Sequence, residues 1–303
     1  MTALPADTLR WAARVAGPNA TAYNVRRLAG STTSTLYALD IFDGAAPLPC
    51  VLRVYDNAAW LASEPDAPWR EAAALARVTA AGLPTPSLVA CDPEGAETGG
   101  VPCLLMTRLP GEVVLAPDNL DRWLHGLAEA LPSLHALPTD DFPWDYQPYA
   151  DLSTLTPPAW SRVPELWERA LALSRTPPPP APLCFIHRDY HPNNVLWQNS
   201  RVSGIVDWPS ACLGDASVDV AWCRKNLMYL HGIEAADTFL QAYETVADPS
   251  FPYQPYWDVM VLLEELPGPP RPYPPWAEFG VCVTAEMMRG RVDDYLESVL
   301  RRL

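Results

Sequence analysis

The chain has 303 residues, and 49% of them are hydrophobic, which suits one large domain or two lobes with a sizeable buried core. Its formal net charge of −15 argues against nucleic-acid binding as the main activity, because a phosphate backbone needs a basic surface. The first residues lack the pattern of a signal peptide, and no stretch approaches the roughly 18 consecutive apolar residues of a membrane span. We therefore expect a soluble, cytoplasmic protein with no nucleic-acid or membrane partner and no obligate protein partner.

The cysteines favour reduced thiols in the core. They are scattered singly, no two form a CxxC pair, and their number is odd. A zinc site or a disulfide framework is the alternative. The seven positions are Cys50, Cys91, Cys103, Cys184, Cys212, Cys223 and Cys282.

The first hundred residues alternate short strand-like runs with turn signals. The runs predicted as strands cover residues 22–30, 34–42, 49–56, 86–92 and 101–109. Between the third and the fourth run, residues 64–82 have the apolar spacing of a helix, and Gly82 is a plausible end. We expect residues 1–108 to form a β-rich lobe with one main helix.

The remainder, residues 109–303, is predicted to be a larger and mostly helical lobe that begins with a helical segment over 118–137. Residues 142–182 are rich in proline and aromatic side chains, which favours irregular or extended backbone around one short helix over 163–174. Its tryptophans favour burial, so we interpret this segment as an insertion on the lobe and not as a free linker.

Polar residues gather where a predicted hairpin begins and ends. A strand-like run over 183–186 leads into a polar loop, and two short strands joined by a turn at residues 199–200 then lead to Asp207. Asp189, Asn194 and Asp207 are thereby expected to converge. Two carboxylates and an amide oxygen suit Mg²⁺, which is usually bound together with substrate phosphates, so the pattern indicates phosphoryl transfer.

The same residues carry a family resemblance. "HRDYHPNN" fits the kinase pattern H-x-D-x-x-x-x-N, and "GIVDWPSACLGDASVDVAW" follows it with Asp207 in place. Together they resemble the aminoglycoside phosphotransferase and choline kinase superfamily more than the protein kinases, because few residues separate Asp207 from the next helix. The resemblance implies an α+β, two-lobed protein-kinase-like fold, with a nucleotide-binding first lobe and a catalytic, acceptor-binding second lobe. It also implies Mg²⁺ and ATP or GTP as phosphoryl donor.

In the first lobe the resemblance implies a phosphate-covering loop, a strand cation with a helix partner, and a connector for the adenine. The residues at these positions are Gly30, Ser31, Thr32, Thr33, Ser34, Arg53, Glu71, Met106 and Arg108. Two departures stand out. The loop has one glycine followed by hydroxyl residues, and the strand cation is an arginine, which is not equivalent to lysine. The single lysine of the chain, Lys225, lies on a later predicted helix.

In the second lobe the resemblance implies that Asp189 orients or deprotonates the acceptor hydroxyl and that Asn194 and Asp207 bind the metal. His187 and Asp219 would support the loop. Arg188 has no assigned role, because the chain has no room for the phosphorylated segment that such an arginine meets in regulated protein kinases.

The acceptor is expected to be a small molecule, neutral or cationic. Residues 233–303 contain twelve acidic residues against five arginines, which favours a polyamine-like or quaternary-ammonium compound over an anionic one. Solvated helix faces and ordinary core packing are the alternatives. The candidate acceptor-binding residues are His191, Trp257, Asp258, Glu264 and Trp276.

The favoured function is therefore a small-molecule O-phosphotransferase whose acceptor is an aminoglycoside or another antibiotic, which would connect it to antibiotic resistance. A choline-type or sugar-type metabolite kinase stays open, as does a kinase-like nucleotide-binding protein with little or no catalysis. A regulatory or scaffold protein that binds partners through the proline-rich segment is the weaker alternative.

Overall fold

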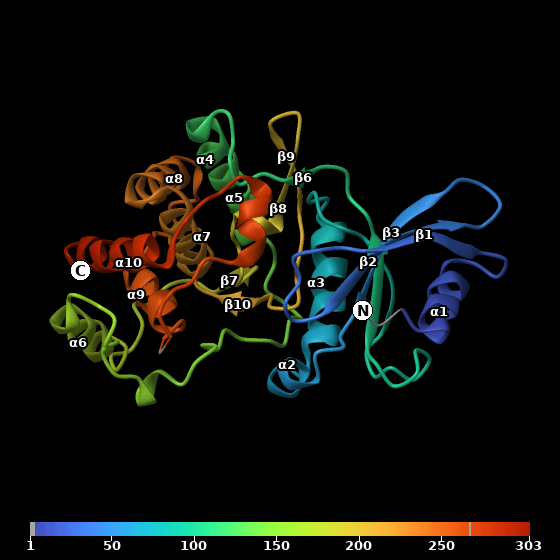
Figure 1. The fold of residues 1–303 in the computed structure, drawn as a ribbon, viewed down its shortest axis with the longest axis horizontal. Coiled ribbons are helices and arrows are strands. Elements are labelled where there is room, and N and C mark those ends of the chain that lie inside the picture. Colours follow the sequence, from blue (N-terminus) through green and yellow to red (C-terminus); the bar gives the residue numbers. More distant parts are fainter. Residues whose placement is uncertain (1–3, 267) are drawn as a thin grey trace. The chain divides into compact units, whose positions relative to one another are not determined.

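The computed structural model describes residues 4–266 and 268–303 (Figure 1). The chain forms two compact units. The first consists of Met1–Gly111 with Ser203–Ser210, and the second of Glu112–Val202 with Ala211–Leu303. The expected assignment of nucleotide binding to residues 1–108 and of catalysis to residues 109–303 stays a prediction.

The first unit contains an antiparallel five-stranded sheet with the order β1-β2-β3-β5-β4. Its strands are β1 Thr21–Arg27, β2 Thr35–Phe42, β3 Leu48–Val54, β4 Leu88–Asp92 and β5 Cys103–Thr107. Its helices are α1 Ala6–Ala16, α2 Ala58–Ser63 and α3 Ala67–Ala80. All five predicted strands and the predicted main helix are confirmed.

Side-chain alternation along β3 decides where its cation points. Cys50, Leu52 and Val54 share one face of the strand and belong to a buried cluster that includes Trp11 of α1. Arg53 lies between two of them and therefore faces the other side of the sheet. Helix α3 packs on β4 and β5, and Glu71 is one of its buried residues. This strand register brings Arg53 to Glu71.

The second unit is mostly helical. Its helices are α4 Leu120–Glu129, α5 Leu131–His135, α6 Pro164–Leu173, α7 Ala216–His231, α8 Ile233–Val246, α9 Tyr256–Leu263 and α10 Ala285–Leu300. Its short strands are β6 Glu112–Val113, β7 Cys184–Ile186, β8 Val195–Gln198 and β10 Cys212–Gly214. Three 3₁₀ turns complete it, at Leu152–Thr154, Pro192–Asn194 and Pro274–Phe279.

Helix α7 is the centre of the second unit. It contacts α8, α9 and α10, and residues 216–230 are all buried (Figure 1). A helix that is buried on every side has no polar stripe, so its charged residues need partners inside the protein. Arg224 and Lys225 have ion-pair partners, and Asp219 lies 3.1 Å from Nε2 of His135.

The proline-rich and aromatic segment is mostly irregular, as its composition predicts. Between α5 and β7 the only helix longer than one turn in the described part of the chain is α6, inside the range predicted for it. The predicted turn is also present: Asn199 and Ser200, both with positive φ, connect β8 to β9, Arg201–Ile205. Within β9 the chain passes from the second unit to the first.

Candidate active site

The polar loop of the second unit begins where a buried strand ends. Every residue of β7 is buried, and β7 pairs antiparallel with β10, so the position at which the loop starts is fixed by the sheet. The loop runs from His187 to a 3₁₀ turn at Pro192–Asn194, which leads directly into β8. The loop is thus fixed at both ends by strands.

Asp219, in the first turn of α7, supports the loop from inside. Its side chain is fully buried and accepts hydrogen bonds from the backbone N–H groups of His187 (2.9 Å) and Arg188 (2.7 Å). His135 of α5 places Nε2 3.1 Å from the same carboxylate. Arg188 has φ +67°, which is unfavourable for a residue with a side chain, and the two hydrogen bonds hold it there. These contacts are those of a residue that supports the loop.

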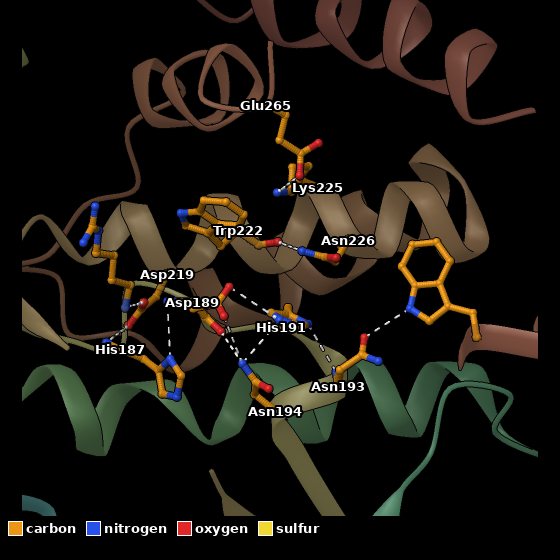
Figure 2. A network of polar contacts seen from close by, with 12 residues as sticks. His187, Asp189, His191, Asn193, Asn194, Asp219, Trp222, Lys225, Asn226 and Glu265 are labelled. Carbon is orange, nitrogen blue, oxygen red and sulfur yellow. Dashed lines mark hydrogen bonds and ion pairs between the residues drawn. The ribbon is translucent and has the colours of Figure 1, made fainter. Parts of the chain in front are cut away.

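Asp189 follows on this constrained backbone (Figure 2). Its side chain is 31% exposed. His191 Nε2 lies 3.5 Å from its Oδ1. The Nδ1 atom of His191 accepts the backbone N–H of Asn193, so a neutral ring carries its proton on Nε2, facing Asp189. Burial acts to raise the pKa of Asp189, but the combined effects of His191, His187 and Lys225 oppose it, and the pKa is lowered. Asp189 is therefore ionised at neutral pH.

Asn194 is oriented by the same loop. Its Nδ2 donates to the backbone carbonyl of Asp189 (2.9 Å) and to the Asp189 carboxylate (3.4 Å). With the amide nitrogen bound on this side, the amide oxygen is the end of the side chain that suits a cation.

A second cluster lies in the first unit, around Arg53. Arg53 is 2% exposed. Its Nε lies 2.9 Å from the carboxylate of Glu71, and its Nη2 lies 2.7 Å from that of Asp207. The guanidinium also donates to Ser34 Oγ (2.9 Å). Glu71 also accepts from the hydroxyl of Tyr55. Burial works against the charge of Arg53, but Glu71 and Asp207 raise its pKa. Burial also raises the pKa of Glu71, and Arg53 opposes that rise.

Asp207 has φ +73° and engages Arg53 through Oδ1. Its side chain is 37% exposed. One carboxylate oxygen is therefore fixed by an arginine, and the other is left for a cation.

The hydroxyl-rich loop between β1 and β2 is held at several points. Gly30 has φ +102°, a conformation that favours glycine. Ser31 and Ser34 place their hydroxyl oxygens 3.1 Å apart, and the side chain of Asn57 donates to the carbonyl of Thr32 (3.3 Å). Thr33 is partly exposed. The loop therefore presents hydroxyl groups close to the Arg53 cluster, which shares Ser34.

Met106 and Arg108, the two residues expected in the connector for the adenine, are both engaged by the sheet of the first unit. Met106 is buried in β5 between partners in β3 and β4. The backbone N–H of Arg108 donates to the carbonyl of Pro49, and its side chain pairs with Asp40 (3.1 Å). The N–H group of Arg108 is thus committed to the protein and is not available to a base.

Several predicted acceptor residues are engaged in packing. Asp258 is 1% exposed, pairs with Arg224 and accepts from Tyr295 (2.7 Å). Trp257 is buried and donates to Asp215 (2.8 Å). We therefore leave both out of the acceptor site.

Glu264 accepts the backbone N–H of Tyr149 (3.0 Å) and the hydroxyl of Tyr146. Trp276 is buried, and its Nε1 lies 3.4 Å from Asn193 Oδ1, next to the loop. Sequence reasoning missed three residues near this loop: His135, Trp222 and Glu265. The sequence pointed to one of them only indirectly, because Lys225, the partner of Glu265, is the single lysine of the chain.

Two features are absent from the described residues. Among residues 4–266 and 268–303, no helix is both long and apolar enough to cross a membrane. In the same residues, no group of three or more His, Cys, Asp or Glu side chains could hold a metal ion. All seven cysteines are free thiols; five are buried, as the sequence predicts, whereas Cys91 is partly exposed and Cys282 is exposed.

Comparison with known proteins assigns the class. A small antiparallel-sheet unit and a helical unit with an H-x-D-x-x-x-x-N loop define a kinase-like α+β fold. The model of the family described as "Phosphotransferase enzyme family" matches residues 24–260, and the chain belongs to that family. A sequence comparison with curated proteins gives no match.

Solved structures of similar fold are antibiotic phosphotransferases. Aminoglycoside-3'-phosphotransferase of type VIII is 22% identical, with a TM-score of 0.54 over 80% of this chain and 92% of its own. APH(4)-Ia, in a ternary complex with ADP and hygromycin B, is 17% identical, with a TM-score of 0.60 over 93% and 94%. Macrolide 2'-phosphotransferase MphH from Brachybacterium faecium is 17% identical, with a TM-score of 0.55 over 84% and 87%. These likenesses confirm the kinase-like fold.

The buried carboxylate of Asp219 generates a stability prediction. Asp219→Ala leaves two buried N–H groups and His135 without their acceptor, so the free energy of unfolding should fall by about 2 to 5 kcal/mol. Urea unfolding measures this. Asp118→Asn, at an exposed position of the same unit, is the control and should change stability little. Equal stability of the two variants would contradict the supporting role.

A second prediction concerns pH. Because the pKa of Asp189 is lower in the folded protein than in the unfolded chain, its ionised form stabilises the fold above the unfolded value of about 4. That contribution disappears as the pH falls through the folded-state pKa. The stability difference between wild type and Asp189→Asn should therefore shrink from pH 6 to pH 3, as urea unfolding would show. A constant difference would exclude the lowered pKa.

Proposed function

We propose that this protein is a small-molecule O-phosphotransferase that transfers the γ-phosphate of ATP or GTP to a hydroxyl of a small acceptor. The observation that carries the proposal is the Asp189 carboxylate, which is ionised and partly exposed on a mostly buried loop held by Asp219. Membership of the phosphotransferase family supports the reaction type.

In the proposed reaction the acceptor oxygen attacks the γ-phosphorus, and the bond from that phosphorus to the bridging oxygen of the nucleotide breaks. Asp189 accepts a hydrogen bond from the acceptor hydroxyl and receives its proton as the new bond forms. Its lowered pKa makes it a weak base, so orientation of the hydroxyl is its larger contribution. The Nε2–H of His191 helps to keep the carboxylate ionised.

Asn194 and Asp207 are the proposed Mg²⁺ ligands. Each residue by itself suits a hard cation, since one end of its side chain is held by the protein and one oxygen is left. When bound, the ion would neutralise charge on the phosphates. Arg53, Ser34 and the hydroxyl-rich loop are the proposed phosphate-binding groups, with Glu71 holding the arginine in place.

Antibiotics are the first acceptors to test, because similar folds include aminoglycoside and macrolide phosphotransferases. A nucleotide-binding protein with little catalysis is the second candidate. The observation that favours it is that Arg53 already binds two carboxylates and a serine hydroxyl of the protein.

Substitution of Asp189 separates the two candidates. Asp189→Ala should lower phosphotransfer by about 10² to 10⁴-fold while nucleotide binding persists, because the side chain acts on the acceptor. The assay uses ATP and GTP with Mg²⁺ and a panel of aminoglycosides, macrolides, choline and sugars. Asp118→Asn is again the control. Nucleotide binding by wild type without transfer to any acceptor would favour the second candidate.

Arg53 generates a prediction on nucleotide binding. Arg53→Met leaves Glu71 buried without its cation, so we expect the free energy of unfolding to fall by about 3 to 5 kcal/mol. We also expect the affinity for the nucleotide to fall. Arg53→Lys keeps the charge but has one nitrogen where arginine uses three, so nucleotide binding should survive with reduced stability. Calorimetry and urea unfolding measure both effects. Arg26→Met, at an exposed position of β1, is the control. Unchanged nucleotide binding in Arg53→Met would exclude a phosphate-binding role.

A further inference from the structure

The ammonium group of the single lysine, Lys225, lies between an aromatic ring and a carboxylate of the same chain. Lys225 is 2% exposed, and its Nζ lies 3.4 Å from the ring centroid of Trp222. It pairs with Glu265 (Figure 2). Glu265 also accepts from the hydroxyl of Tyr229 (2.6 Å). An aromatic face with a carboxylate beside it is the arrangement that proteins use to bind an ammonium group.

Arg188 fills a second arrangement of the same kind. Its guanidinium carbon lies 3.7 Å from the ring centroid of Tyr149 and 5.6 Å from that of Tyr146, and the guanidinium donates to the carbonyl of Gln147. Glu264 accepts from the backbone of Tyr149 and from Tyr146. This is again a cation with aromatic rings and a nearby carboxylate.

The two arrangements are adjacent and lie next to the proposed catalytic residue. The rings of Tyr149 and Trp222 meet edge to face with centroids 5.8 Å apart. The two carboxylates are consecutive residues at the end of α9, and Arg188 directly precedes Asp189. Figure 2 shows Trp222 and Lys225 on α7 beside Asp189.

Two further acidic groups of this unit are buried and have partners inside the chain. Asp258 pairs with Arg224, and Asp293 accepts from Ser161 and from Arg162. Two of the acidic residues in 233–303, which as a group favoured a cationic acceptor, are thus paired with arginines of the protein itself.

We propose that Arg188 and Lys225 occupy, from within the chain, the two cation sites beside Asp189, and that the enzyme therefore selects a neutral hydroxyl compound over one that presents ammonium groups there. The acceptor preference rests on the proposed function. An ammonium-bearing acceptor would have to displace a buried lysine or bind next to two fixed positive charges, and both are unfavourable.

Because Lys225 is the single lysine, NMR can observe it alone. Wild-type protein labelled with [ε-¹³C]lysine should give one side-chain signal, shifted upfield by the ring of Trp222, and Trp222→Leu should lose that shift. Spermidine at millimolar concentration should leave the wild-type signal unchanged. A signal at the random-coil position, or one that spermidine moves there, would overturn occupancy of the site.

Removal of the side chain should open the site. The melting temperature of Lys225→Ala should rise by about 2 °C or more with saturating ethylammonium, since a ligand that binds only the folded state stabilises it. Wild type and Lys225→Met, in which the space is filled, are the controls and should not respond, nor should Lys225→Ala respond to propanol. A response no larger than that of the controls would contradict the site. Should Lys225→Ala not fold, the NMR experiment on wild type decides.

Acceptor preference is tested by transfer assays of wild type and Lys225→Met with neutral sugars and with aminoglycosides. We expect wild-type kcat/KM to be at least tenfold higher for the best neutral acceptor. A higher value for an aminoglycoside would overturn the preference. Absence of transfer to every acceptor would overturn the proposed function and the preference with it, whereas the NMR and melting experiments would still decide whether the two sites are filled.

Discussion

The geometry of the second unit depends on one buried carboxylate. Asp219 accepts two consecutive backbone N–H groups of the loop, and this pair holds Arg188 at a positive φ that an isolated chain would avoid. At this turn the guanidinium of Arg188 lies over the ring of Tyr149 in the insertion, and the next residue, Asp189, is partly exposed. This pair of hydrogen bonds therefore determines both the position of Asp189 and the attachment of the segment beside it.

Local patterns predicted most of the fold. The five strands of the sheet, helix α3 and the turn at Asn199 and Ser200 follow from period-two and helical spacing together with turn residues, which act over a few neighbours. Helix α1 was missed, although Trp11 and Ala12 form its buried side, because its short sequence was considered only as a possible signal peptide. The kinase-like fold was predictable because one motif has several fixed spacings.

Side-chain partners were much less predictable. The acidic composition of residues 233–303 indicated a cationic acceptor, but Asp258 meets Arg224, which is 34 positions away. His135 and Asp219 are separated by 84 positions, and nothing in the sequence links them. Charge counts describe an average surface, whereas the pairing inside a helical unit is determined by which helices pack together. The same limit applies to Arg108, whose backbone donor is used by the sheet.

The arginine at position 53 has a consequence for how the protein responds to its surroundings. A buried lysine can release its proton as its environment changes, whereas a guanidinium stays charged under all conditions in which a protein is folded. The cation shared by Glu71, Asp207 and Ser34 is therefore constant from acidic to alkaline solution. Any change of protonation within this cluster must take place on an oxygen atom, either of the two carboxylates or of the Tyr55 hydroxyl bound to Glu71.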